Sequence, residues 1–427
     1  MRSTGDKIYF KTHNIIFKDE NCLDKGYYPD IDEILHRGNE MERYIGHLSK
    51  ILNNVVPENL FIFGKMGTGK TMVSKVLTSQ LEKEASSFGI KVKTVYIHCK
   101  AKSTNIAVMR CINDSIGLQV NGYRIKTGNS FDFYFSKFCK LAKDYNGFLI
   151  IILDEVDNLI DPDILNIFAR VKESGFLDRN VTIIGITNDV RFDEKLDART
   201  RSVLAQKDII FHPYNADQLK DILSQRAELA FIYGVLEDTV IPLCAAYAAK
   251  HNGDARKALE LLRYSGNIAK ERKEGKVTEE HVKLAKERIE RDKISEIIRT
   301  LPTYSKIVLA SCIVNLTKEM SYKSYTGEIY NTYRNLCMEI GIEATTQRHV
   351  TELISELSAL GIINAVEKSK GRHGRTKEVT LAVSAKSAWD VLVEDYSLNY
   401  LRHIDLFKNV ERSKESDLLQ MNLKAFK

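Results

Sequence analysis

Proline, tryptophan and long hydrophobic runs are scarce in this sequence of 427 residues, which has six prolines and one tryptophan. The longest apolar runs, such as Phe148 to Leu153, are far shorter than the roughly 18 residues that a membrane helix needs. The first ten residues, MRSTGDKIYF, lack the apolar centre of a secretory signal. We therefore expect neither a membrane protein nor an exported one.

The seven cysteines form no CxxC pair, and no Cys/His cluster has the spacing of a zinc site. We expect reduced thiols in the interior rather than disulfides. The composition is 44% hydrophobic and 28% charged, which is ordinary for a globular protein and sufficient for a packed core. A net charge of +6 permits an acidic polymer as partner without requiring one. The length predicts two or three domains.

Short apolar segments alternate with helical stretches from about residue 59 to residue 214. This alternation is typical of a doubly wound parallel sheet, an α/β fold. Beyond Tyr214 the pattern is amphipathic and helical for some 80 residues, which predicts a small all-helical domain. The expected strands are Leu60 to Phe63, Val92 to Cys99, Phe148 to Leu153, Val181 to Thr187 and Asp208 to Phe211, and the expected helices Asp217 to Tyr233, Asp238 to His251, Asp254 to Lys273 and Glu279 to Ile298.

A phosphate-binding motif follows the first of these strands. The segment GKMGTGKT, residues 64 to 71, matches GxxxxGK[ST] and lies directly between a strand and a helix. Glycines let backbone N–H groups face a phosphate, the lysine reaches the outer phosphates, and the final threonine is a magnesium ligand. The residues expected to bind the nucleotide here are Gly64, Gly67, Thr68, Gly69, Lys70 and Thr71.

Acidic residues leave the strand FLIIIL at the edge where open parallel sheets bind ligands. We expect Asp154 to hold magnesium through its water shell and Glu155 to orient and deprotonate the attacking water. Asp157 either contributes to this site or only caps the next helix.

Three further polar positions are open to two interpretations on residues alone. Asn188, after the strand Val181 to Thr187, either bonds the γ-phosphate and the water or belongs to an ordinary turn. Arg199 either stabilises a transferring phosphoryl group, often of a neighbouring subunit, or makes a surface ion pair. Asp254 is a candidate N-cap, and Arg256 in the following turn could report which nucleotide is bound.

Taken together, GKMGTGKT, IIILDEVD, IIGITND, LDARTRS and HNGDARKAL resemble the successive motifs of an AAA+ ATPase. More narrowly, they resemble the archaeal initiator family related to the eukaryotic origin recognition complex and its helicase-loading partner, over about residues 26 to 385. In that family these motifs are Walker A, Walker B, sensor 1, arginine finger and sensor 2. The resemblance assigns them to Lys70 and Thr71, Asp154 and Glu155, Asn188, Arg199, and Arg256.

The resemblance also implies the division of the chain and the place of the base. It implies an N-terminal extension at 1–25, an AAA+ core at 26–214, a helical lid at 215–295, and a winged-helix domain with a C-terminal tail at 296–427. Adenine is expected near His36, Arg37 and Tyr214. The segment from 117 to 133, which contains Arg124, falls where such initiators carry a DNA-contacting insertion, although an ordinary surface loop fits its residues equally well.

The segment from 300 to 385 indicates DNA binding. Helical patterns at Thr303 to Leu316 and Thr326 to Ile340 precede a third helix, TTQRHVTELISELSAL. Its polar face is what a helix in the major groove would present, but an ordinary solvated face has the same pattern. Arg348 is the best candidate for reading a base, with Glu352 one turn on. The expected polar strip is Thr345, Arg348, Glu352 and Ser355.

A basic connection follows between two predicted strands, Ile362 to Glu367 and Lys377 to Val383. Residues 368 to 377, KSKGRHGRTK, carry no acid, and their glycines allow close approach to a polyanion. A basic hairpin after three helices is the winged-helix arrangement, with the wing on phosphates or in a minor groove. The candidate DNA contacts of this wing are Lys370, Arg372, Arg375 and Lys377.

These features predict a replication initiator that uses ATP/ADP and Mg²⁺ as a switch, with slow hydrolysis. The expected partners are origin double-stranded DNA, the replicative minichromosome-maintenance helicase and related initiators, in the cytoplasm at the nucleoid. Two alternatives stay open: an ATP-gated winged-helix transcription regulator or signalling ATPase, and an ATP-driven remodeller whose wing contacts protein.

Overall fold

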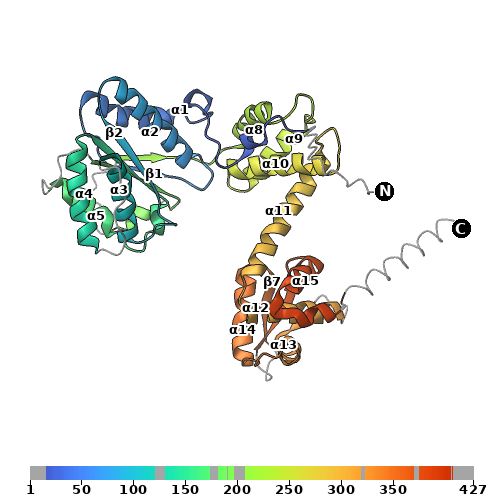
Figure 1. Cartoon of the computed structure of the whole chain (residues 1–427). Helices are drawn as coiled ribbons and strands as arrows, with labels where there is room; N and C mark the ends of the chain where they lie inside the picture. Colours follow the sequence, from blue (N-terminus) through green and yellow to red (C-terminus); the bar gives the residue numbers. More distant parts are fainter. Residues whose placement is uncertain are drawn as a thin grey trace, which may run out of the picture. The chain divides into compact units, whose positions relative to one another are not determined.

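The computed structural model describes residues 16–120, 130–173, 181–189, 191–196, 207–318, 323–369, 375–404 and 406. The chain forms two compact units, residues 1–285 and 286–427 (Figure 1). Among the described residues, no helix is both long and apolar enough to cross a bilayer. All seven cysteines are free thiols, five of them buried.

The first unit contains the expected parallel sheet. Its strands are β1 (Leu60–Phe63), β2 (Val92–His98), β3 (Phe148–Asp154), β4 (Val181–Thr187) and β5 (Lys207–Ile210), in the order β2-β3-β4-β1-β5. Every pairing is parallel. The carboxyl ends of β1, β3 and β4 therefore meet at one edge, where the sequence places the phosphate-binding loop, the two carboxylates and Asn188.

Helices cover both faces of this sheet, as the two-sided burial of β3 requires. Alternate residues of β3 enter different cores: Leu149, Ile151 and Leu153 pack on one side, and Ile150 and Ile152 on the other. The first core includes α3 (Asn105–Val120), α4 (Phe131–Tyr145) and α5 (Asp163–Glu173), and the second includes α1 (Gly38–Leu48) and α2 (Lys70–Ser87). Shorter elements are η1 (Glu20–Leu23), η2 (Ile31–Glu33), η3 (Ser49–Asn53), η4 (Val156–Asn158) and α6 (Phe192–Lys195).

A helical lid completes the first unit, as expected. It comprises α8 (Ala216–Ala230), α9 (Val240–Lys250), α10 (Ala255–Glu271) and the start of α11 (Glu279–Thr300). Residues 16 to 23, assigned from the sequence to an extension, pack on this lid. Phe17 is buried and its ring centroid lies 4.8 Å from that of Phe231, while the Lys18 N–H donates to the Ala230 carbonyl at 2.8 Å.

The second unit is a winged helix. It contains α12 (Thr303–Lys318), β6 (Ser324–Tyr325), α13 (Thr326–Ile340), α14 (Gln347–Ala359), β7 (Ile363–Ser369), β8 (Arg375–Leu381), α15 (Ala385–Glu394) and η6 (Tyr396–His403). Its three strands form an antiparallel sheet in the order β6-β8-β7. The sequence analysis assigned neither β6, which is only two residues long, nor α15, which buries Trp389 in the core of this unit.

The packing of the N-terminal segment predicts a local effect on the lid. Phe17→Ala removes a buried ring, so the free energy of local opening of α8 and α10 should fall by about 3 to 5 kcal/mol. Amide hydrogen exchange of these helices measures the loss. Phe88→Ala is the matched control, because the Phe88 side chain is 70% exposed. Equal protection of α8 and α10 in the two variants would contradict a role for Phe17 in lid stability.

Candidate nucleotide site and nucleic-acid interface

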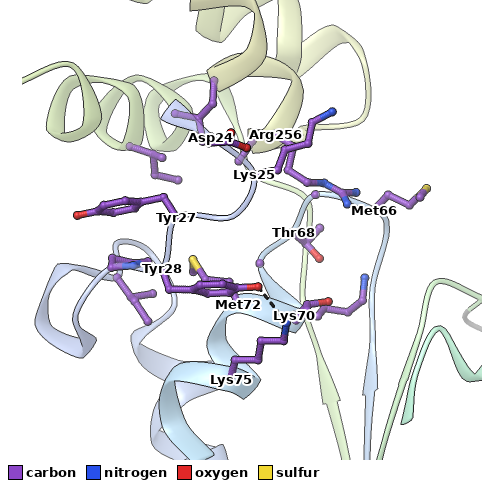
Figure 2. A pocket seen from close by; sticks show the side chains of 18 of the residues that line it. Asp24, Lys25, Tyr27, Tyr28, Met66, Thr68, Lys70, Met72, Lys75 and Arg256 are labelled. Carbon is purple, nitrogen blue, oxygen red and sulfur yellow. Dashed lines mark hydrogen bonds between the residues drawn. The ribbon is translucent and has the colours of Figure 1, made fainter. Parts of the chain in front are cut away.

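A cavity of about 320 Å³ lies at the carboxyl edge of the sheet. It is bounded by the phosphate-binding loop, the ends of β2 and β3, the segment from 22 to 35, and the lid (Figure 2). Of the residues expected to bind or act on the nucleotide, the cavity wall includes Gly67, Thr68, Gly69, Lys70, Thr71, Asp154, Glu155, Asn188, Tyr214 and Arg256.

The loop before α2 owes its shape to its glycines. Gly67 has φ +76°, and a Cβ on it would lie 1.7 Å from Oδ1 of Asp254. Gly69 has φ +91° and precedes the first residue of α2. The Thr68 hydroxyl donates to the Lys65 carbonyl at 2.9 Å. These features present a curled loop to the N-terminus of an 18-residue helix, which is a ready anion site.

Lys70 is the buried cation of this loop. Its Nζ donates to the carbonyls of Gly64 and Lys65 at 2.6 and 2.8 Å, and to Oδ1 of Asn188 at 3.0 Å. Burial lowers the pKa of the ammonium to about 8, against the raising effect of Asp154. Three acceptors thus fix the ammonium between the phosphate loop and the end of β4, where a phosphate oxygen could replace one of them.

Thr71 and Asp154 form a pair suited to magnesium. The Thr71 hydroxyl donates to Oδ2 of Asp154 at 2.7 Å, and Asp154 is only 4% exposed. Oxygen ligands of this kind fit Mg²⁺, which usually takes one or two protein groups and completes its shell with phosphates and water. Accordingly, among the described residues no cluster of three or more His, Cys, Asp or Glu side chains could hold a metal by itself.

Two side chains beside this pair escaped sequence analysis. The Tyr96 hydroxyl in β2 donates to Oδ2 of Asp154 at 2.6 Å. Burial, with the neighbouring Asp154, raises the pKa of Tyr96. At the end of β2, Nε2 of His98 lies 3.8 Å from Oε2 of Glu155. β2 and β3 are neighbours in the sheet but far apart in the sequence. Spacing along the sequence therefore gave no sign of either contact.

Asp157 links the two strands that carry the polar groups. Its Oδ1 accepts from the Thr187 hydroxyl at 2.7 Å and from the Asn188 N–H at 3.3 Å. Asp157 therefore holds the end of β4 and orients Asn188 toward Lys70. The sequence had left its role open between the site and a helix cap.

The lid reaches the phosphate loop through the start of α10. Asp254 is the N-cap, as expected, and its Oδ1 accepts from the Arg256 N–H at 3.0 Å. The Ala255 N–H donates to the Gly67 carbonyl at 3.2 Å. The Arg256 side chain is partly exposed, lines the cavity and lies beside the loop (Figure 2).

The three residues expected near adenine have different positions. Tyr214 lines the cavity, whereas His36 and Arg37 do not. Arg37 is buried behind the loop. Its guanidinium donates to the carbonyls of Thr68 and His212 at 3.0 and 2.7 Å, and it lies 3.8 Å from the centroid of the Tyr214 ring. His36 pairs with Asp221 of the lid at 2.9 Å. The wall away from the phosphate loop is formed instead by Tyr27, Tyr28, Pro29, Ile34, Leu35 and Ile222.

Several expected site residues lie outside the described part of the chain. These are Arg199 and Arg124, together with Lys370 and Arg372 of the basic wing segment. Arg375 begins β8, where it pairs with Ser369.

In the second unit, α14 presents Arg348 to solvent. The Arg348 side chain is 91% exposed, and its Nε lies 3.4 Å from Oε1 of Glu352. Thr346 caps this helix, so Thr345 precedes it rather than belonging to its polar face. The Thr345 hydroxyl and N–H lie 3.2 and 3.3 Å from the Tyr333 hydroxyl. Thr345 thus ties α14 to α13.

The wing strands pack beside the first turns of α14. An open cavity of about 340 Å³ is lined by Thr326, Gln347, Arg348, Thr351, Glu367, Thr376 and Lys377. The Lys377 ammonium donates to the Ser355 hydroxyl of α14. Behind it, Glu378 pairs with Lys323 and Lys368, which lowers the pKa of this carboxyl. Helix α14 and the wing therefore share one polar surface.

Comparisons with known proteins agree with both units. Residues 57–185 match a model described as an AAA domain, 220–287 a Cdc6 AAA+ ATPase-type lid domain, and 296–391 a CDC6 C-terminal winged helix domain. The chain is 43% identical over 389 residues to the ORC1-type DNA replication protein 1 of Methanosarcina mazei, covering 90% of this chain and 92% of that protein. It belongs to the ORC1-type DNA replication proteins.

Other members of this family match nearly as well. The ORC1-type DNA replication protein of Pyrococcus abyssi is 42% identical, over 92% of this chain and 93% of its own length. The solved structure of the Aeropyrum pernix ORC1 protein in complex with DNA has a TM-score of 0.75 and 38% identity, covering 91% of this chain and 100% of that one. This ORC1-type chain thus has the family's AAA+ core, helical lid and winged helix, and the AAA+ core implies nucleotide binding.

The contacts of Asp157 predict that it stabilises the nucleotide site. Asp157→Ala leaves the buried Thr187 hydroxyl and the Asn188 N–H without their acceptor, which should cost about 1 to 3 kcal/mol of unfolding free energy. Asp157→Asn keeps an acceptor oxygen and should lose less. Urea unfolding followed by far-UV circular dichroism gives the values. Asp144→Ala, at an exposed position of α4, is the control, and a loss for Asp157→Ala no larger than this control would contradict the assignment.

Proposed function

We propose that this ORC1-type protein is a DNA replication initiator that binds origin double-stranded DNA under the control of ATP and then recruits or loads the replicative helicase. The observation that carries the proposal is the joining, in one chain, of a phosphate-binding edge with a winged helix whose helix α14 exposes Arg348. Membership of the ORC1-type family supports replication as the process. The relative from Aeropyrum pernix, whose structure contains DNA, supports DNA as the ligand.

The nucleotide is proposed to enter the cavity with its phosphates on the loop before α2. Lys70 then exchanges one of its present acceptors for a phosphate oxygen, and Asn188 is left to orient the attacking water. Thr71 and Asp154 hold Mg²⁺, whose charge offsets that of the phosphates. Glu155 serves as the base that orients and deprotonates the water. This chemistry is positioning and charge stabilisation. Hydrolysis is proposed to be slow and to act as a switch.

The remaining roles complete the switch. Arg256, carried by the lid, is proposed to sense the γ-phosphate, and Arg199 to act on the nucleotide of a neighbouring copy. Adenine is proposed to lie against Tyr214 and the apolar wall formed by Tyr28 and Ile34. His36 and Arg37 then support the base site from behind rather than touching it.

DNA binding is proposed for the second unit through α14 and the wing. Arg348 is free to reach a base edge, because its contact with Glu352 is exposed and weak. The wing candidates Lys370, Arg372, Arg375 and Lys377 are proposed to meet phosphates. Arg124, in the segment from 117 to 133, is proposed as a further contact from the first unit. The proposed partners are the replicative helicase and related initiators. The proposed location is the cytoplasm, at the nucleoid.

The decisive experiment is recovery of DNA with the protein from its own cells. Immunoprecipitation should enrich the replication origin above the rest of the chromosome. Enrichment at promoters away from the origin, with normal replication after depletion of the protein, would instead identify a transcription regulator.

The phosphate edge predicts distinct effects for two variants. Lys70→Ala should abolish nucleotide binding, because it removes the buried cation. Glu155→Gln should still bind ATP but hydrolyse it about 100-fold more slowly or worse, because a positioned base contributes typically that much. Calorimetric binding and single-turnover phosphate release measure the two steps. Equal hydrolysis by Glu155→Gln and the wild type would remove Glu155 from the mechanism.

The exposed position of Arg348 on α14 predicts a loss of DNA affinity that depends on the DNA sequence. Arg348→Ala should cost about 1 to 3 kcal/mol on the preferred site and much less on random duplex. Fluorescence anisotropy at several salt concentrations gives affinities for both. Arg299→Ala is the control, since Arg299 pairs with Glu394 of α15 at 2.8 Å and should leave both affinities unchanged.

The wing should respond differently in the same titrations. The double change Arg372→Ala and Arg375→Ala should flatten the slope of log affinity against log salt by about 1 to 2, since each lost phosphate contact contributes roughly 0.9. For Arg348→Ala, an equal loss of affinity for all DNA sequences would mean that this arginine contacts only the DNA backbone.

A further inference from the structure

Tyr96 has a hydroxyl in a place where packing alone does not require one. Its ring is half-buried on β2 beside the core formed with α2, and phenylalanine would fill the same space. The hydroxyl nevertheless makes a short hydrogen bond, 2.6 Å, to Oδ2 of Asp154. This is the carboxylate oxygen that also accepts from Thr71, the candidate magnesium ligand.

The orientation of the Asp154 carboxylate is therefore fixed from several sides. Oδ2 accepts from Thr71 and Tyr96, and Oδ1 accepts from the Glu155 N–H at 3.0 Å. Thr71 lies on the phosphate side, on α2, whereas Tyr96 belongs to the neighbouring strand. Hydrogen bonds from a second layer of residues commonly hold metal-ligating carboxylates in the geometry that the ion needs.

Lys75 connects this tyrosine to Tyr28, another residue of the cavity wall. It lies on α2 one turn after Thr71, and its Nζ is 3.9 Å from the centroid of the Tyr96 ring. The same ammonium donates to the Tyr28 hydroxyl at 3.0 Å (Figure 2). A cation over an aromatic face is attracted to it, and it withdraws electron density from the phenol, which strengthens the phenol as a donor.

We propose that Tyr96 is a positioning residue for the magnesium carboxylate, and that Lys75 couples it to Tyr28 on the wall proposed to receive the base. Tyr28, Lys75, Tyr96 and Asp154 then form one continuous chain of contacts along the wall of the nucleotide cavity. Movement of Tyr28 against a bound nucleotide is transmitted to the metal carboxylate through the Lys75 ammonium. The inference rests on the proposed function, because it requires that the chain bind ATP with Mg²⁺.

The test measures ATP affinity by calorimetry, without divalent metal and then at increasing Mg²⁺ concentrations. Tyr96→Phe should bind ATP as the wild type does when metal is absent, because no group that contacts phosphate is removed. The Mg²⁺ concentration that gives half of the metal-dependent gain in affinity should rise about 10-fold or more, the usual effect of losing an outer partner of a metal ligand. Thermal melting establishes that both proteins are folded.

Tyr145→Phe is the matched control. Tyr145 is a buried tyrosine at the end of α4, next to the amino end of β3, and it does not line the cavity. This variant should show the wild-type response to Mg²⁺. An unchanged Mg²⁺ midpoint for Tyr96→Phe would overturn the inference, and so would an equal loss of ATP affinity with and without metal, which would mean a general defect of the pocket.

Lys75→Met tests the coupling, since it keeps the length of the side chain and removes its charge. It should raise the Mg²⁺ midpoint in the same direction, and it should add little in the Tyr96→Phe background because both changes act through one hydroxyl. Fully additive effects, or no effect of Lys75→Met, would overturn the coupling of Lys75 to the Tyr96 hydroxyl, and with it the chain of contacts to Tyr28. A wild-type protein whose ATP affinity ignores Mg²⁺ would refute the proposed function itself, a result distinct from all of these.

Discussion

The arrangement of the nucleotide site depends on the buried ammonium of Lys70, which must be surrounded by hydrogen-bond acceptors. A cation in this position must have acceptors on several sides, because desolvation without partners is costly. The curled loop supplies two carbonyls, and β4 supplies the amide of Asn188. The strand order places β4 directly between β1 and β3. One sheet edge therefore brings the phosphate-binding loop, the amide of Asn188 and the carboxylate of Asp154 to the same point.

The lid and the N-terminal segment make this edge responsive to what occupies it. Helix α10 begins against Gly67, with a hydrogen bond from Ala255 to the loop. Residues 16 to 23 pack on α8 and α10, and the chain then continues along the cavity wall at Tyr27 and Tyr28. A nucleotide bound in this cavity, as proposed, would contact the core, the lid and this segment together. Differential contacts of this kind allow ATP and ADP to favour different arrangements of one protein.

The second unit shows how a small domain prepares a surface for a polyanion. Most of its core lies between α12, α13, α14 and α15, so the outer turns of α14 need no apolar residues. Glu378 pairs with Lys323 and Lys368. Lys377 instead donates to Ser355 of α14. Arg348 and Lys377 thus line one cavity beside α14, the surface through which DNA binding is proposed.

The sequence alone determined those features that depend on neighbours along the chain. The bounds expected for β1 and β4 agree with the structure, because short runs of Ile, Val and Phe between turns have few alternatives. The motif GKMGTGKT, the acidic end of β3 and the cap Asp254 were all found from local spacing. Parallel pairing then made their meeting at one edge predictable.

Only the tertiary structure decided the contacts between residues that are distant in sequence. Tyr96 and Asp154 lie 58 residues apart, and Phe17 meets Phe231 across most of the first unit. The contacts of Arg37 with Thr68 and of His36 with Asp221 could not be read from the sequence either. Thr345 precedes the helix that it was expected to join. Periodicity gives the face of an element, but the partner of that face depends on how the elements pack.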